Sequence, residues 1–297
     1  MQEFKVCGIQ IASKPNDIKY NLEKIRYWAK KAHEEFHPEL MVFPETVTTG
    51  FSPNMPLEDF YNLVEPVPGP STEVVGKLSK ELGAYIVFPT YEKGSREKVI
   101  YNSAVLIGPR EGIIGKYRKT HLFPTERLEG GGWSTAGSEA PVFDLGFARI
   151  GIMICYDGDF PELSREMALL GAEVMVRPSA LLRSFDIWAL TNSARAYDNH
   201  VYVVGVNAVG PDAAGNYYFG HSMVVSPIAQ KLAQARGTEE IMMSTLSPDP
   251  IKYVSFGTNT PMIFDHIEDR NIGVYKNILK EGKCPFEPAR RIPYQRN

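Results

Sequence analysis

Cys155 lies at a point of the sequence where a thiol, a buried strand and the start of a helix meet. The preceding residues 148–154 are apolar and rich in β-branched side chains, which predicts a buried strand. Residues 159–163 open a helical pattern, with Pro161 in the first turn. Backbone N–H groups and the helix dipole at such a turn favour a thiolate, and therefore a nucleophile. A lone cysteine in an apolar strand is more often a core residue, so this interpretation needs partners elsewhere.

Three charged residues can supply those partners. Glu45 directly follows the apolar run 40–43, and a carboxylate in a cleft at that point could move protons. Lys119 ends a basic strand and could favour the thiolate and then hold a developing oxyanion. Glu126, in the loop that follows, could orient Lys119 or the substrate. Each of them taken alone is a common exposed charge, and only together with Cys155 do they indicate a catalytic site.

Strand and helix patterns alternate along the chain, which predicts an α/β fold with an antiparallel portion. The expected elements are strands 4–12, 40–43 and 85–89, helices 18–36, 71–82 and 184–196, and a hairpin of 101–107 with 113–118.

The second half of the chain replays the first in the same order, which suggests a duplicated β-α-β-α-β-β unit. Two such sheets, each covered by helices on one face, would bury their bare faces against each other. The predicted architecture is a four-layer α-β-β-α sandwich with pseudo-two-fold internal duplication. The matching segments are 4–11 with 147–154, 40–45 with 174–179, 84–88 with 201–205, and 101–105 with 220–224.

Composition narrows the class of protein. The chain has 297 residues, enough for one large domain or two modest ones, and we place a single domain at 1–270. Residues 271–297, rich in Pro and Arg, are expected to form a C-terminal tail that packs on a partner subunit. The net charge of −3 gives no electrostatic reason to expect nucleic acid or a membrane as a partner.

Three widely spaced cysteines and the lack of an apolar leader or spanning segment lead us to expect a cytoplasmic protein. The six histidines form no close-spaced ligand set, and no glycine loop of the phosphate-cradling type follows a strand. We therefore expect neither a metal nor an organic cofactor.

The three motifs resemble those of the nitrilase superfamily of carbon–nitrogen hydrolases. That family has a Glu in Phe-Pro-Glu (43–45 here), a Lys in Tyr-Arg-Lys-x-His-Leu (117–122), and a Cys in Ile-Cys-Tyr-Asp followed by Pro-Glu (154–162). The resemblance extends from residue 4 to about residue 234 and implies the same four-layer sandwich. By resemblance, Glu45 is the general base, Lys119 the oxyanion stabiliser and Cys155 the nucleophile, and Glu126 matches the second, structural glutamate of some branches. Family members commonly form homodimers or higher homo-oligomers.

Residues around the thiol favour an amide substrate. True nitrilases usually carry Trp-Glu after the cysteine, and this chain has Tyr156-Asp157, as amide-cleaving branches tend to. N-carbamoyl amino acid hydrolases often place arginines where Gly158 and Asp159 stand. We therefore expect a thiol-dependent hydrolase that cleaves a small linear amide to a carboxylic acid and ammonia through a thioester. An N-carbamoyl hydrolase or a nitrilase with the same triad is the main alternative, and a catalytically silent small-molecule binding protein is the non-enzyme one.

The sequence signal for substrate-binding residues is less specific than the signal for the catalytic residues. Phe51, Trp133 and Tyr156 are expected to form an apolar acyl site of modest size. Arg177 and Ser179, at the end of the segment 174–179, are the polar candidates.

Overall fold

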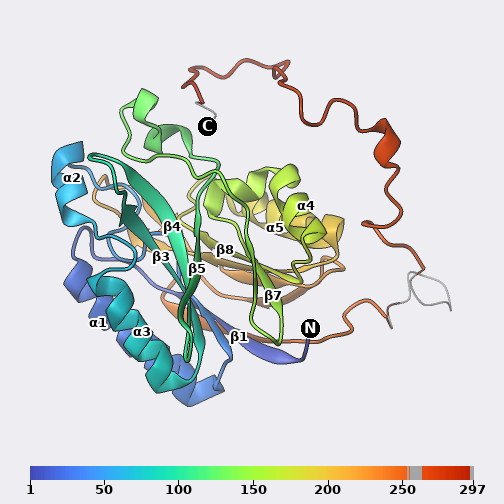
Figure 1. Ribbon diagram of the computed structural model, residues 1–297, viewed down its shortest axis with the longest axis horizontal. Coiled ribbons are helices and arrows are strands. Elements are labelled where there is room, and N and C mark those ends of the chain that lie inside the picture. Colours follow the sequence, from blue (N-terminus) through green and yellow to red (C-terminus); the bar gives the residue numbers. More distant parts are fainter. Residues whose placement is uncertain (253, 255–262, 295–297) are drawn as a thin grey trace.

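The computed structural model describes residues 1–252, 254 and 263–294, and its centre is a pair of six-stranded sheets (Figure 1). The first sheet has the order β14-β1-β2-β3-β4-β5, and the second has the order β13-β12-β9-β8-β7-β6. The strands of the first sheet are β1 (Phe4–Gln10), β2 (Leu40–Val42), β3 (Tyr85–Lys93), β4 (Ile100–Gly108), β5 (Gly112–Arg118) and β14 (Glu240–Leu246). Those of the second are β6 (Val142–Asp144), β7 (Arg149–Ile152), β8 (Val174–Ser179), β9 (Tyr202–Asn207), β12 (Met223–Val225) and β13 (Lys231–Gln234). A short hairpin of β10 (Val209–Pro211) and β11 (Tyr217–Phe219) stands apart from both sheets.

Pairing of the strands confirms the predicted duplication. In the first sheet β1, β2 and β3 run parallel, and β3-β4 and β4-β5 are antiparallel. The second sheet repeats this pattern with β7, β8 and β9 parallel and with β9-β12 and β12-β13 antiparallel. Each sheet gains one antiparallel edge strand, β14 beside β1 and β6 beside β7.

Helices cover the outer face of each sheet, which confirms the four-layer sandwich. Helices α1 (Ile18–Phe36) and α3 (Pro70–Leu82) pack on the first sheet, and α4 (Pro161–Leu169) and α5 (Phe185–Asn199) on the second (Figure 1). Local signals explain where the helices begin and end. The Asp17 side chain accepts a hydrogen bond from the Tyr20 N–H at the start of α1, and Gly83 ends α3 at a φ of 63°.

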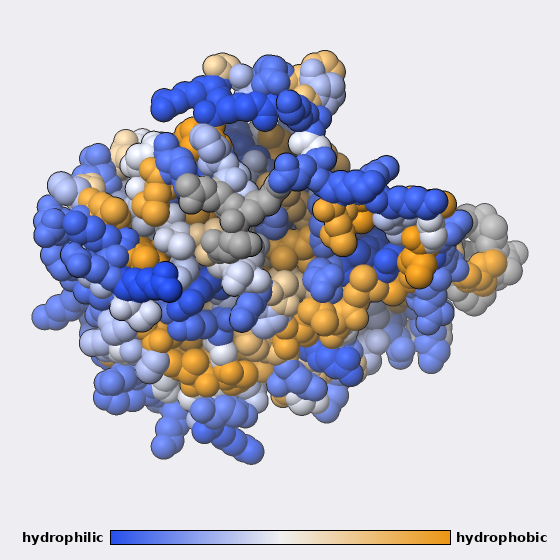
Figure 2. Space-filling model, turned by 45° about the horizontal axis from the view of Figure 1, so that its top comes forward, coloured by the Kyte–Doolittle hydropathy of each residue, from blue (hydrophilic) through white to orange (hydrophobic). Residues whose placement is uncertain are grey.

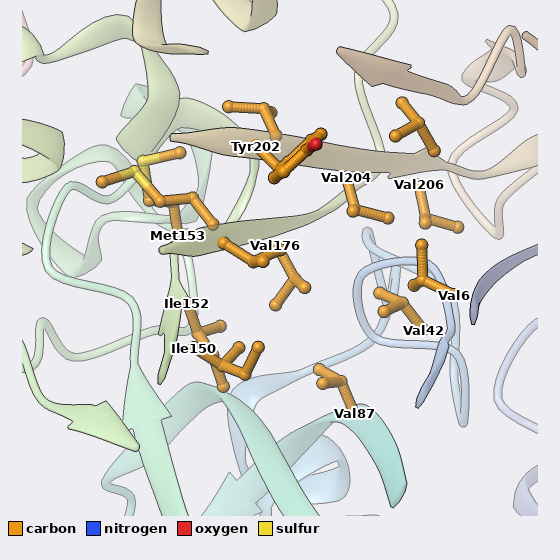
Figure 3. Packing of buried hydrophobic residues seen from close by; sticks show 14 of the residues in the cluster. Val6, Val42, Val87, Ile150, Ile152, Met153, Val176, Tyr202, Val204 and Val206 are labelled. Atoms are coloured by element: carbon orange, nitrogen blue, oxygen red, sulfur yellow. The ribbon is translucent and has the colours of Figure 1, made fainter. Parts of the chain in front are cut away.

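Successive side chains along each strand point to opposite faces of the sheet, so the buried strand residues form two separate clusters. Val6, Val42 and Val87 of the first sheet point toward Val176 and Val204 of the second, and these buried side chains fill the centre of the sandwich (Figure 3). The residues one position along these strands point the other way and pack under α1 and α3 in a second cluster. Members of that second cluster include Cys7, Met41, Phe43, Ile86 and Phe88.

The helix predicted to open at residues 159–163 begins at Pro161, and a 3₁₀ turn, η3 (Cys155–Asp159), separates it from the preceding strand. One short helix, α2 (Leu57–Leu63), was not predicted, because its seven residues are too few to show a helical period. In the described part of the chain, no helix has the length and apolar character needed to cross a bilayer.

The described tail leaves the sandwich and returns to it near residues 120–127 (Figure 1). Residues 273–291 are exposed or nearly so, and Ile292 and Tyr294 then contact Arg127 and Thr120 of the same chain. In Figure 2 apolar side chains (orange) gather in a band across the face turned to the viewer, among mostly polar ones (blue). The domain division at residue 270 and the packing of the tail on a partner stay predictions, and residues 295–297 of that tail lie outside the described residues.

Candidate active site

The three predicted catalytic side chains lie just beyond the ends of strands from both sheets. Glu45 follows β2, Lys119 follows β5 and Cys155 follows β7. A fourth strand, β8, ends at Ser179, and the next residue, Ala180, joins the two sheets at this point. Its backbone N–H donates to Glu45 Oε2 at 2.8 Å across 135 positions of sequence.

Lys119 is the centre of a buried charge cluster. Its Nζ lies 2.8 Å from Glu45 Oε1 and 2.9 Å from Glu126 Oε2, and all three side chains are at most 1% exposed. Burial alone would lower the pKa of Lys119, but the charges of Glu126 and Glu45 raise it well above the usual range. Lys119 is therefore a fixed cation. An ammonium has three donors, and these two carboxylates occupy two of them, which leaves one for a developing oxyanion.

Glu126 completes this cluster from η1 (Pro124–Glu126). Its Oε1 is buried and, within the described ranges, has no hydrogen-bond partner. Burial raises the pKa of the Glu126 carboxyl to about 7, although the charge of Lys119 acts in the opposite direction. Asn102 holds the other carboxylate, since its Nδ2 donates to Glu45 Oε1 at 2.8 Å. The sequence analysis found Glu126 and missed Asn102, whose position on β4 gave no signal of function.

Cys155 opens the 3₁₀ turn in a strained backbone conformation with a φ of 49°. Two buried polar side chains hold this turn. Arg177 Nε donates to the Cys155 carbonyl at 2.8 Å. Asp157 accepts from the backbone N–H groups of Ile154, at 2.8 Å, and His121, at 2.9 Å, and thereby ties the turn to the segment that carries Lys119.

The thiol of Cys155 is not the thiolate that the sequence predicts. Burial, and then the charge of Glu45, raise its pKa to about 12, and Lys119, Arg177 and the Ala180 N–H lower it only in part. The Cys155 side chain is only 7% exposed, and desolvation destabilises its thiolate more than the turn and the neighbouring cations stabilise it. A protonated thiol acts as a nucleophile only when a base removes its proton during the attack.

Thiol labelling tests this protonation state. We expect the labelling of Cys155 by methyl methanethiosulfonate, a small reagent without an amide group, to be slow at neutral pH. The labelling rate should keep rising as the pH passes about 8.5, which is the ordinary pKa of a free cysteine thiol, because burial disfavours the thiolate of Cys155. The exposed Cys284 serves as an internal reference when both peptides are followed by mass spectrometry. Faster labelling of Cys155 than of Cys284 at neutral pH would contradict the raised pKa.

A cavity of about 680 Å³ opens over Cys155. Phe51 and Trp133 line it, as the sequence predicts, and their rings meet edge to face at 5.8 Å. Tyr156 lies beside the cavity, not in its lining, and packs edge to face on Phe123 at 5.3 Å. Further apolar walls come from residues that the sequence analysis did not single out, namely Met55, Phe123, Leu181 and Leu182.

Arg177 and Ser179 do not lie where a substrate contact requires. Both side chains are fully buried, and neither lines the cavity. Arg177 lies under the Cys155 turn, and Ser179 Oγ donates to the Arg177 carbonyl at 3.2 Å. Alternation along β8 points Arg177 to the α5 side of the sheet, where NH1 donates to Thr191 Oγ1 and Asn192 Oδ1. The prediction that both residues bind substrate is corrected: Arg177 instead holds the Cys155 carbonyl, and Ser179 bonds to the backbone of Arg177.

Comparisons with known proteins agree with this fold and identify the family. Residues 5–253 match the carbon-nitrogen hydrolase family, so the chain belongs to that family. It is 37% identical over 237 residues to a nitrilase of Pyrococcus abyssi, covering 80% of this chain and 86% of the relative. It is also 31% identical to an (R)-stereoselective amidase of a Pseudomonas species, covering 91% and 92%. A solved Saccharomyces cerevisiae member of branch 10 of the nitrilase superfamily has the same fold, with a TM-score of 0.74, 28% identity and coverage of 84% and 92%.

Family membership makes this protein a carbon–nitrogen hydrolase of the nitrilase superfamily. The relatives include proteins named as nitrilases and proteins named as amidases. The bond that this chain cleaves has to be argued from its own site.

Proposed function

We propose that this protein is an amidase that hydrolyses a small linear amide to a carboxylic acid and ammonia through a thioester with Cys155. The observation that carries the proposal is the buried Lys119 held between two carboxylates next to a thiol at the floor of an apolar cavity. Such an arrangement is costly for stability, because three ionisable groups are removed from water. It suits a reaction in which a proton is moved and a negative charge develops on an oxygen.

In the proposed mechanism Glu45 accepts the thiol proton while Cys155 Sγ attacks the amide carbon. The free donor of Lys119 and the backbone N–H of Tyr156 bind the oxyanion of the tetrahedral intermediate. Glu45 then gives the proton to the leaving nitrogen, and ammonia departs from a thioester. Water loses a proton to Glu45, attacks the thioester and releases the acid, and the proton returns to the sulfur. Glu126 and Asn102 hold Lys119 and Glu45 in place for both halves of this cycle.

Ammonia release tests the proposal directly. The protein is incubated with small amides, N-carbamoyl amino acids and nitriles, and ammonia, carbon dioxide and the acid are measured. Release of ammonia and acid from amides, with the other two classes at least tenfold slower, is the expected result. Carbon dioxide from the carbamoyl compounds would indicate an N-carbamoyl hydrolase, and conversion of nitriles alone would indicate a nitrilase. Binding of these compounds without turnover would support the non-catalytic alternative.

We also propose that the chain forms a homodimer or higher oligomer. Two apolar side chains of the tail, Leu279 and Phe286, are 94% and 81% exposed in the single chain, and Leu169 and Leu170 at the end of α4 are about half exposed. A second copy packed on these residues would remove them from water. Sedimentation velocity on the full chain checks this, and a monomer at all concentrations would contradict it.

A further inference from the structure

The cavity over Cys155 has one charged residue among its described lining residues, Arg183. The other polar contributions come from neutral groups such as those of Ser52, Asn54 and Asn216. Arg183 lies just before α5, with its guanidinium 5.5 Å from the centre of the Tyr156 ring. A cation at this place would ordinarily suit a substrate that carries a second, negatively charged group.

The guanidinium of Arg183 is already paired with the carboxylate of Asp159. Arg183 NH1 lies 2.5 Å from Asp159 Oδ2, and NH2 lies 3.1 Å from Oδ1, so the two side chains meet as a two-pronged pair. Asp159 Oδ1 also accepts a hydrogen bond from Arg177 NH2 at 3.3 Å. A substrate carboxylate would have to displace this pair and would then lie beside a second negative charge.

The neighbouring position leaves no room for another cation. A Cβ atom at Gly158 would lie 2.2 Å from the guanidinium carbon of Arg177. An arginine at 158 is therefore excluded by the group that holds the Cys155 carbonyl. Positions 158 and 159 are therefore both closed to a carboxylate receptor, 158 by lack of space and 159 by its negative charge.

We infer that the Arg183–Asp159 pair makes the cavity selective for amides with an uncharged acyl group, and that Asp159 is the residue that excludes a second carboxylate. This inference rests on the proposed amidase function and assigns its substrate class. The apolar walls of Phe51, Trp133 and Leu181 would contact the acyl chain, and Arg183 would border the cavity with its charge paired to Asp159.

Glutaramide and glutaramate form a matched pair of probes, because they have the same length and differ in the charge of one end. For the wild type we expect kcat/KM to be at least about tenfold higher for glutaramide. In Asp159→Asn the Arg183 charge is released, and this ratio should fall by about tenfold. Because both substrates are measured on one preparation, damage to the nucleophile turn cancels in the ratio.

Arg183→Gln supplies the control through a double-mutant cycle. When Asp159→Asn is made in the Arg183→Gln background, the relative gain in kcat/KM for glutaramate should shrink to less than about threefold. Arg177, the other cation on Asp159, is fully buried and does not line the cavity. An unchanged ratio in Asp159→Asn would overturn the inference. So would a wild type that prefers glutaramate and loses this preference in Arg183→Gln, because Arg183 would then be the carboxylate receptor. Failure of the wild type on both amides, and on all neutral amides of the panel, would instead contradict the amidase function, and the inference with it.

Discussion

Replacing Cys155 by alanine should lower the rate of ammonia release from the best amide substrate by at least about a thousandfold. The alanine variant keeps the fold of the turn but has no atom that can form the thioester. The Lys119 cluster alone could still polarise the amide, so a small residual rate above the uncatalysed one is compatible with the mechanism. Ammonia release under saturating substrate is the measurement, with intact-mass spectrometry to show that the acyl adduct is lost as well.

Cys7→Ala is the matched control for this variant. Cys7 is a buried cysteine like Cys155, but it lies in the cluster beneath α1 and α3, away from the cavity. We expect Cys7→Ala to lose some stability and to keep its turnover. Equal loss of activity in the two variants would mean that the effect of Cys155→Ala is a folding defect. Full activity of Cys155→Ala would remove the thiol from the mechanism.

Replacing Glu45 by glutamine should lower kcat by about a hundredfold to ten-thousandfold, the usual contribution of a general base. The loss is expected to be large here because the raised pKa of Cys155 leaves the resting enzyme with a protonated thiol. Substrate binding should change much less than kcat, since Glu45 is not among the residues that line the cavity. Steady-state kinetics on the best amide separate the two effects.

Glu92→Gln is the matched control for Glu45→Gln. Glu92 is also a buried carboxylate with cationic partners, at 2.6 Å from Lys116 Nζ and 2.6 Å from Arg118 NH2, but it lies outside the cavity. We expect it to lose stability, in the range of about 1–3 kcal/mol for a buried polar group that loses its partner, and to retain its kcat when folded. Near-normal activity of Glu45→Gln, with the variant correctly folded, would show that another group takes the thiol proton.

Much of this site could be predicted because its reactive side chains lie in short sequence motifs. Glu45 and Cys155 follow strands whose apolar runs are visible in the sequence, and Lys119 follows the second strand of the predicted hairpin. Strands that end at the same edge bring such residues together. The residues that hold them were less visible. Asn102 and the Ala180 N–H act on Glu45 from far along the chain, and no local pattern marks either of them.

Arg177 shows why a correct strand assignment is not enough to place a functional side chain. The sequence located the strand and its end, but a shift of one residue along a strand changes the face to which a side chain points. Arg177 therefore supports the backbone of Cys155 and does not reach the substrate cavity.

The sequence by itself determined the duplicated α/β sandwich and the three catalytic side chains of the proposed mechanism, because periodicity, turn signals and motif spacing are local properties of the chain. Only the tertiary structure decided the raised pKa of the Cys155 thiol, the Arg183–Asp159 ion pair and the walls of the cavity. These depend on burial and on contacts between residues that are distant in sequence. Desolvation and the distances between charges exist only once the two sheets have packed together.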